Sequence, residues 1–479
     1  MATGVSSSES AEVPSRERAS APPGPVAGTA PEWVPGRREQ LVLAVVCAAT
    51  LLTLADYTAP AVVLPTLAAD LHASATAQVW VLNGITFGLA VLLLSAGSIA
   101  DDYGRRRVFV GGVAGLALAM AASALASSAW VFVGARVVQG IAGAAILAAG
   151  LGLVADAFPP GPHRLRAAAT WGSMIGLGIA SGPLLAVAGA QAGSWRTFYW
   201  VAGVVGLGLA VAGRPLLRES RSARARRIDV PGVVLLAAAL VALLVGATNG
   251  RTGWLRPAAL APIAASLLLF ALFALREARA GEPMIDLALF RRPPFLLATL
   301  GALATGVAVI GPMTFLPTAL QRGSGWTALQ TAVLAFAWAF TMFLVGLAAR
   351  RMRSSAHGGL ELGAGFVLSA AGCAVSLPAV GYAPGWLFPG MILAGLGGGL
   401  INATLPRLAV GTVPPERSAM GSGANNTARY VGSALGVAVT ASLAPTSPRE
   451  ALAVGIALCL VAAVALLPLA ARARVPAVA

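Results

Sequence analysis

Lysine is absent from this chain, and all 33 of its basic residues are arginine. Charged residues of both signs make up only 11% of the 479 residues, whereas soluble domains carry about 25%. Hydrophobic residues make up 57%, and the mean hydropathy is +0.81. A water-soluble fold could not bury that much apolar surface, so a soluble globular protein is excluded.

Groups that bind metals or act as nucleophiles are also scarce. The three cysteines lie far apart in separate hydrophobic runs, and the three histidines lie in separate connections. No G-x-x-x-x-G-K or H-E-x-x-H pattern is present. We therefore expect no enzymatic activity, no cofactor and no metal site.

Hydrophobic runs follow one another from Leu41 almost to the last residue. A helix that crosses a bilayer needs about 20 apolar residues, and these runs lack the alternation of barrel strands. The sequence predicts an all-α polytopic membrane protein with about 14 transmembrane helices. The predicted spans are 41–68, 77–100, 108–127, 130–156, 167–190, 198–217, 230–247, 257–275, 295–318, 327–349, 359–380, 385–410, 418–443 and 451–471.

The arginines alternate strongly between the two sides of these spans. One set of connections and tails carries 26 of them, the other carries five, and two lie inside spans. Because arginine accumulates on the cytoplasmic side, both termini are expected in the cytoplasm, with the protein in the cytoplasmic (inner) membrane. The net charge of +15 is thus a topology signal, and the lipid bilayer is the expected partner rather than nucleic acid.

A weak internal repeat suggests two related halves. Pro159-Pro160 after the fourth span corresponds to Pro414-Pro415 after the twelfth. Transporters built from such parallel repeats bind substrate near the bilayer midplane, between the halves. The expected domains are a disordered cytoplasmic tail (1–40), a six-helix bundle (41–217), two inserted transmembrane helices with flanking loops (218–294) and a second six-helix bundle (295–479).

The loop between the second and third spans contains the most specific motif. Gly97 allows close helix approach, Gly104 permits a tight turn, and Asp101 can pair with Arg105 or cap the next helix. With Arg106 these residues resemble the G-x-x-x-D-R-x-G-R-R loop of the major facilitator superfamily. The resemblance implies a conformational lock between two rocking halves, while a purely topological basic loop is the alternative.

The first span carries Asp56 about fifteen residues inside the bilayer, where a charge costs about 2.5 kcal/mol or more. Asp56, Thr58 two residues later and Leu64-Pro65 near the end of the span resemble the first-span motif of drug/proton antiporters. Arg136 in span four lies in a pattern similar to the superfamily's R-x-x-Q-G, and Asp56 is its best candidate partner. The resemblance implies that these two residues couple transport to protons. A structural carboxyl group or a permanent ion pair remains the alternative.

The fifth span resembles the antiporter motif that ends in G-P, through Gly178, Gly182 and Pro183. This motif marks exporters, although Ala186 and Val187 stand where the family has Gly-Gly. Shorter similarities before spans seven and nine, at Asp229 to Gly232 and at Pro283 to Leu287, favour the fourteen-helix branch of the drug/proton antiporters. That branch implies two bundles of six helices with two inserted helices between them (6 + 2 + 6).

These features predict proton-coupled export of amphipathic organic compounds, drugs or secondary metabolites, by a monomer. Alternatives are an importer of the same fold and a membrane sensor or scaffold. Arg429, inside span thirteen, has no acidic residue near it in the sequence and receives no role. Residues expected to line a substrate cavity are Tyr57, Gln139, Trp171, Asn402 and Asn425.

Green fluorescent protein fused after Ala479 should fluoresce and alkaline phosphatase fused there should be inactive, because an even number of spans places both ends on the arginine-rich, cytoplasmic side. Alkaline phosphatase and green fluorescent protein fusions measure this as a complementary pair. A periplasmically active C-terminal fusion would contradict the fourteen-span topology.

Overall fold

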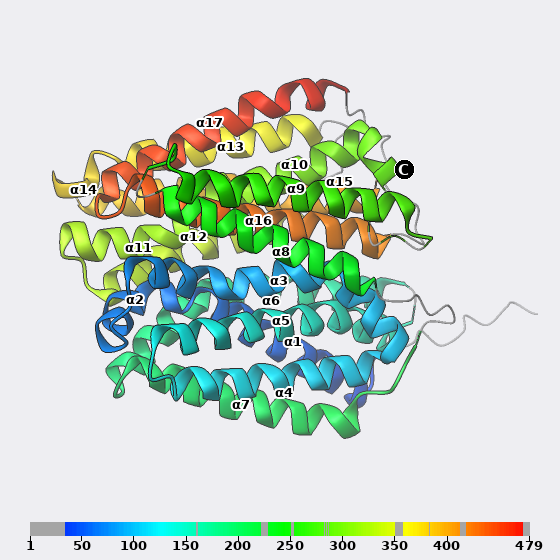
Figure 1. Cartoon of the computed structure of the whole chain (residues 1–479). Coiled ribbons are helices and arrows are strands. Elements are labelled where there is room, and N and C mark those ends of the chain that lie inside the picture. The colour runs from blue at the N-terminus through cyan, green and yellow to red at the C-terminus, as the bar shows by residue number, and fades with distance from the viewer. Residues whose placement is uncertain are drawn as a thin grey trace, which may run out of the picture.

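The structure is a computed structural model. It describes residues 34–472 apart from 160, 222–228, 251–252, 282, 284, 286, 350–357, 383 and 412–417. All regular elements in these residues are helices, and the long ones run side by side along one direction (Figure 1). The expected all-α architecture is confirmed.

Thirteen helical segments of the described residues are long and apolar enough to cross a membrane. The 26-residue helix α16 (Ser418–Leu443) is not among them, because its serines, its asparagines and Arg429 lower its mean hydropathy. It nevertheless packs among the other long helices, against α3 (Ala75–Tyr103), α10 (Pro293–Thr305) and α15 (Leu387–Gly411). With α16 counted, the described residues contain the fourteen spans that the sequence predicts.

The first group of helices, called the N half below, contains the first six spans. Serine side chains at 74, 128 and 194 accept hydrogen bonds from backbone N–H groups at the starts of three of these helices, which fixes where they begin. The first predicted span is two helices, because Pro60 has no N–H to continue the first. The helices are α1 (Arg37–Thr58), α2 (Pro60–Asp70), α3 (Ala75–Tyr103), α4 (Arg105–Ala124), α5 (Ala129–Ala157), α6 (Pro162–Gln191) and α7 (Trp195–Leu216).

The tail predicted for residues 1–40 falls mostly outside the described residues. The helix α1 begins at Arg37, before the expected start at Leu41. Glu39 in its first turn interacts favourably with the positive helix N-terminus.

The second group, called the C half, contains the last six spans. Its first span is interrupted by a π-helical segment, a feature found frequently at functional sites. The elements are η2 (Leu287–Arg291), α10 (Pro293–Thr305), η3 (Gly306–Ile310), α11 (Gly311–Ser324), α12 (Ala328–Ala349), α13 (Gly358–Ser376), α14 (Ala379–Tyr382), η4 (Pro384–Trp386), α15 (Leu387–Gly411), α16 and α17 (Pro448–Arg472).

Two further spans, α8 (Val230–Asn249) and α9 (Pro257–Arg279), form a hairpin between the halves (Figure 1). Asp229 accepts a hydrogen bond from the Gly232 N–H at 3.2 Å, and pairs with Arg276 at 3.0 Å. These bonds close one end of the hairpin. The helix α8 contacts α3 of the N half and α16 of the C half, so it lies over the line where the halves meet.

Glycines let the first span of the C half press against α16. A Cβ atom added at Gly306 would lie 2.2 Å from the carbonyl oxygen of Arg429, and one at Gly432 would lie 2.1 Å from that of Leu303. Such contacts leave no room for a side chain. Because lipid tails are as apolar as leucine, close backbone packing of this kind is a main source of helix association in membranes.

Gly306→Ala should lower the unfolding temperature of the purified protein, since the added methyl group must separate η3 from α16, at a cost of about 1–3 kcal/mol. Gly208→Ala in α7 is the matched control, because a Cβ atom there meets no described atom within 4 Å. Equal thermal stability of the two variants would contradict this packing.

Candidate functional site

A fully buried ion pair lies at the centre of the N half. The Nη1 atom of Arg136 in α5 lies 2.9 Å from Oδ1 of Asp56 in α1. The same nitrogen donates to the backbone oxygen of Asp56 at 2.9 Å, and both side chains are 0% exposed. The structure thus brings together the two charged residues that the sequence singled out in spans one and four.

Neutral side chains complete the surroundings of this pair. Gln139 accepts a hydrogen bond from Arg136 at 3.0 Å and donates one to the Ser123 hydroxyl at 2.9 Å, which links α5 to α4. The Oδ2 atom of Asp56 and the Nε atom of Arg136 are buried, and neither has a hydrogen-bond partner in the residues that the structure describes. The hydrogen-bonding capacity of the pair is therefore only partly used within the described part of the structure.

The helix α6 holds α1 close to the pair through the glycines of the G-P motif. A Cβ atom at Gly182 would lie 2.3 Å from the Ala55 carbonyl oxygen, and one at Gly178 would lie 2.7 Å from that of Leu51. Pro183 follows inside the same helix. These residues fix the backbone of α1 directly beside Asp56.

Tyr57 connects this region to the C half. Its hydroxyl lies 2.9 Å from the Ser433 hydroxyl in α16, and its ring makes an edge contact with Tyr430 at 6.0 Å. Nearby, the Asn83 amide in α3 donates to the Ala434 carbonyl at 3.1 Å. The residue next to Asp56 in the chain thus lies at the contact between the halves, called the central seam below.

Further hydrogen bonds cross the central seam near the end where α2 and α11 lie in Figure 1. Thr318 donates to the Ala61 carbonyl at 3.2 Å, and Gln321 donates to the Val62 carbonyl at 2.8 Å. The two halves are held together at that end of the molecule.

Two residues expected in a substrate cavity make structural contacts. Trp171 donates to the Thr50 hydroxyl at 2.9 Å, which joins α6 to α1. Asn425 donates to the Ala298 carbonyl at 3.0 Å, and its side chain is buried. Their roles toward a substrate, like that of the buried Gln139, stay predictions.

Asn402, also expected in the substrate cavity, lies beside Arg429, the arginine to which the sequence assigned no role. The Oδ1 atom of Asn402 in α15 lies 3.5 Å from Nη1 of Arg429, and Oδ1 of Asn426 accepts from Nη2 at 2.8 Å. Two helices of the C half thus direct amide oxygens at one guanidinium group.

The loop after α3 takes part in a charged network. Gly104 has a φ of 104°, a conformation that favours glycine. Arg105 pairs with Asp156 of α5 at 2.8 Å, while Glu219, after α7, accepts from the Arg106 backbone N–H at 3.1 Å. This network joins the ends of three helices within the N half.

For Gly97 and Asp101, two residues of the predicted conformational lock, the described residues show no contact that would support this role. No described atom lies within 4 Å of a Cβ atom placed at Gly97, so the close helix approach expected there is not made in this arrangement. The side chain of Asp101 lies outside the described part of the structure. The N-cap residue of α4 is Gly104, and no side-chain cap is found there among the described residues.

Sequence reasoning missed several of these partners. Asp156 and Glu219 are acids at span ends, and their pairing with the arginine-rich loop follows only from the fold. Asn83 was detectable in principle, since an amide inside an apolar span must find a partner. Asn426, an amide inside the predicted span 418–443, carries the same signal, whereas Ser433 carries none that is comparable.

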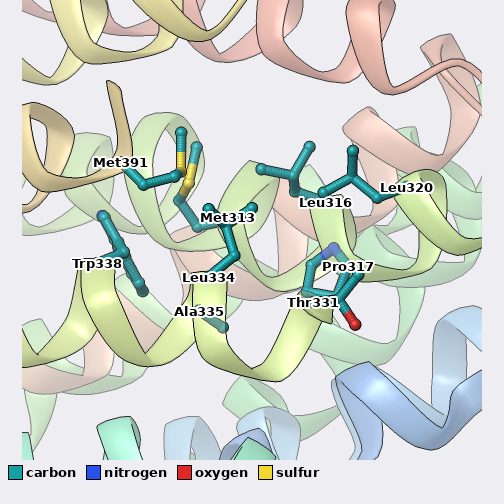
Figure 2. A pocket seen from close by; sticks show the side chains of 9 residues that line it. All are labelled: Met313, Leu316, Pro317, Leu320, Thr331, Leu334, Ala335, Trp338 and Met391. Atoms are coloured by element: carbon teal, nitrogen blue, oxygen red, sulfur yellow. The ribbon is translucent and has the colours of Figure 1, made fainter. Parts of the chain in front are cut away.

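One small cavity lies between α11, α12 and α15 of the C half (Figure 2). At about 10 Å³ it has the scale of one water molecule, which is too small for an organic substrate. Among the described residues, no group of three or more His, Cys, Asp or Glu side chains could hold a metal ion. The lining residues of the cavity are Met313, Leu316, Pro317, Leu320, Thr331, Leu334, Ala335, Trp338 and Met391.

Known proteins resemble this chain over most of its length. The sequence model of the Major Facilitator Superfamily matches residues 46–437. The tetracenomycin C resistance and export protein of Streptomyces glaucescens is 33% identical over 421 residues, covering 87% of this chain and 78% of that protein. The cephamycin export protein CmcT of Amycolatopsis lactamdurans is 34% identical over 423 residues, covering 86% of each.

A solved structure shares the fold. The crystal structure of the human organic anion transporter MFSD10 (TETRAN) matches with a TM-score of 0.61, covering 89% of this chain and 99% of that chain. Its sequence is 18% identical, so the likeness concerns the fold alone.

Arg136→Gln should destabilise the protein by about 3–5 kcal/mol at neutral pH, because it leaves the Asp56 carboxylate buried without its counter-ion. The double variant with Asp56→Asn should lose less than the sum of the two single variants. Chemical unfolding of the purified proteins measures this double-mutant cycle. The exposed pair of Asp70 and Arg196 is the control, with an expected loss of about 0–1 kcal/mol; a similar loss in both pairs would contradict the buried interaction.

Proposed function

Because this chain belongs to the Major Facilitator Superfamily, we propose that it exports amphipathic organic compounds, drugs or secondary metabolites, across the cytoplasmic membrane in exchange for protons. The two relatives named above are export proteins for antibiotics, and each is matched over most of its length. The substrate class is carried over from them as part of this proposal.

The topology we propose places both termini in the cytoplasm, in line with the arginine asymmetry of the sequence. The end of the molecule that carries α2 and α11 then faces outward. The cross-half hydrogen bonds of Thr318 and Gln321 would close that outer end, as one state of an alternating-access cycle requires. The units that move would be the bundles at 41–217 and 295–479.

The observation that carries the proposal is the buried pair of Asp56 and Arg136 beside the central seam. The pair occupies the N half, while the neighbouring Tyr57 bonds to Ser433 of the C half. A motion that separates the halves would break the bond of Tyr57 and change the hydration of Asp56. Since hydration and the distance to a guanidinium set the proton affinity of a carboxyl group, the motion would move a proton on or off Asp56.

The proposed cycle follows from this switch. In the outward-facing state, Oδ2 of Asp56 takes a proton from outside and the compound leaves. In the inward-facing state, the proton departs to the cytoplasm and the next compound binds. The loop network of Gly104, Arg105 and Arg106 would stabilise one of the two states.

An importer of the same fold and a sensor or scaffold are the rivals. Everted vesicles separate them, because an exporter accumulates substrate when respiration acidifies the lumen, whereas an importer does not. A scaffold leaves the proton gradient unaffected by any compound. The G-P motif of α6, packed on α1 beside Asp56, favours the exporter. We propose a monomer without catalytic activity as the working unit.

Asp56→Asn should abolish proton-driven accumulation in everted vesicles, because the amide keeps the shape of the side chain but does not titrate. Exchange of labelled for unlabelled compound down its own gradient should persist. Asp70→Asn, at an exposed carboxylate outside the seam, is the matched control and should pump normally. Undiminished pumping by Asp56→Asn would remove Asp56 from the coupling step.

A further inference from the structure

Arg429 is a second arginine in the middle of a long helix, and its surroundings differ from those of Arg136. Its guanidinium meets two neutral amides, Asn426 at 2.8 Å and Asn402 at 3.5 Å. The ion pairs among the described residues do not include it. Amide oxygens accept hydrogen bonds but cannot neutralise the positive charge.

The hydrogen-bond donors of the Arg429 guanidinium are also only partly paired with acceptors among the described residues. A guanidinium has five N–H groups, and the buried Nε atom of Arg429 has no hydrogen-bond partner in the described part of the chain. A permanently charged group with a free buried donor is costly in the low-dielectric interior of a membrane protein. Such a group gains strongly from an anion that supplies both charge and acceptor oxygens.

The position of Arg429 is fixed and faces the central seam. Its backbone oxygen lies against Gly306 of η3, where no side chain would fit. Its guanidinium carbon lies 5.2 Å from the ring centre of Tyr430, and that ring makes an edge contact with Tyr57 of the N half. The cation is therefore held beside the Tyr430 ring, and that ring contacts Tyr57, the residue that follows Asp56 in the chain.

We propose that Arg429, Asn402 and Asn426 form the binding site for the anionic group of an aromatic organic anion, with the ring system of that compound beside Tyr57 and Tyr430. A carboxylate is the group that fits best, since guanidinium and carboxylate form two parallel hydrogen bonds. This inference rests on the proposed export function, because the anion is taken to be the transported compound. It goes further by stating that the compound carries a negative charge.

The test uses full-length protein in lipid nanodiscs at neutral pH. The probes are 1-naphthoate, 1-naphthamide and 1-naphthylmethylammonium, which share a ring and differ in charge, and the same three groups on benzene and anthracene. Equilibrium binding of the labelled compounds is measured, and the binding to empty nanodiscs is subtracted. For at least one ring size the carboxylate should bind about tenfold or more tightly than the amide.

Variants assign that preference to this site. Arg429→Gln should reduce the carboxylate-to-amide ratio to about one, while Arg429→Lys should keep part of it. Arg449→Gln, in the first turn of α17, removes an arginine elsewhere in the C half and should leave the ratio unchanged. Asn426→Asp tests the site while keeping Arg429, because the new carboxylate is an internal counter-ion that should displace the external anion.

Two results would overturn the inference: no carboxylate preference at any ring size, or a preference that survives both Arg429→Gln and Asn426→Asp. Everted vesicles keep this outcome separate from the export proposal. If they pump a neutral or cationic compound while binding shows no anion preference, export stands and the anion site fails. If 1-naphthoate binds through Arg429 but no compound is pumped, the site stands and export fails.

Discussion

The buried ion pair of Asp56 and Arg136 constrains how the other helices of the N half pack. Hydrocarbon offers no water to solvate either charge, so both must be held by protein atoms. The surrounding helices are built to allow this. Gly84 of α3 leaves room for the Arg136 side chain, since a Cβ atom there would lie 2.8 Å from Cβ of Arg136. On the other side, Gly178 and Gly182 bring α6 against the backbone of α1.

The C half meets the same constraint in another way. Its half-buried Arg429 has two amides and the Tyr430 ring around it in place of a carboxylate, and its helix is fixed by direct backbone contact at Gly306 and Gly432. Both halves therefore place glycines where helix backbones are in contact. They differ in the groups around the arginine, which are a carboxylate in the N half and neutral amides in the C half. Among the described residues the central seam is therefore electrically asymmetric, with an ion pair on one side and a cation without a carboxylate partner on the other.

The sequence predicted the positions of the spans well, because length and hydropathy follow directly from bilayer thickness. It also pointed to Asp56 and Arg136, since two opposite charges in adjoining apolar spans have few other partners. It did not predict the break before Pro60 or the π segment at 306–310, which depend on local backbone geometry and on packing against α16. Contacts across the seam, such as Tyr57 with Ser433, depend on how each helix is rotated, and hydropathy does not report that rotation.

The hairpin of α8 and α9 gives the molecule a front and a back with respect to the surrounding lipid. By lying against both α3 and α16 it covers one of the two lines along which the halves meet, while the line between α6 and α12 has no such hairpin over it among the described residues. The hairpin therefore shields the line between α3 and α16, and the flank at α6 and α12 is the less shielded of the two.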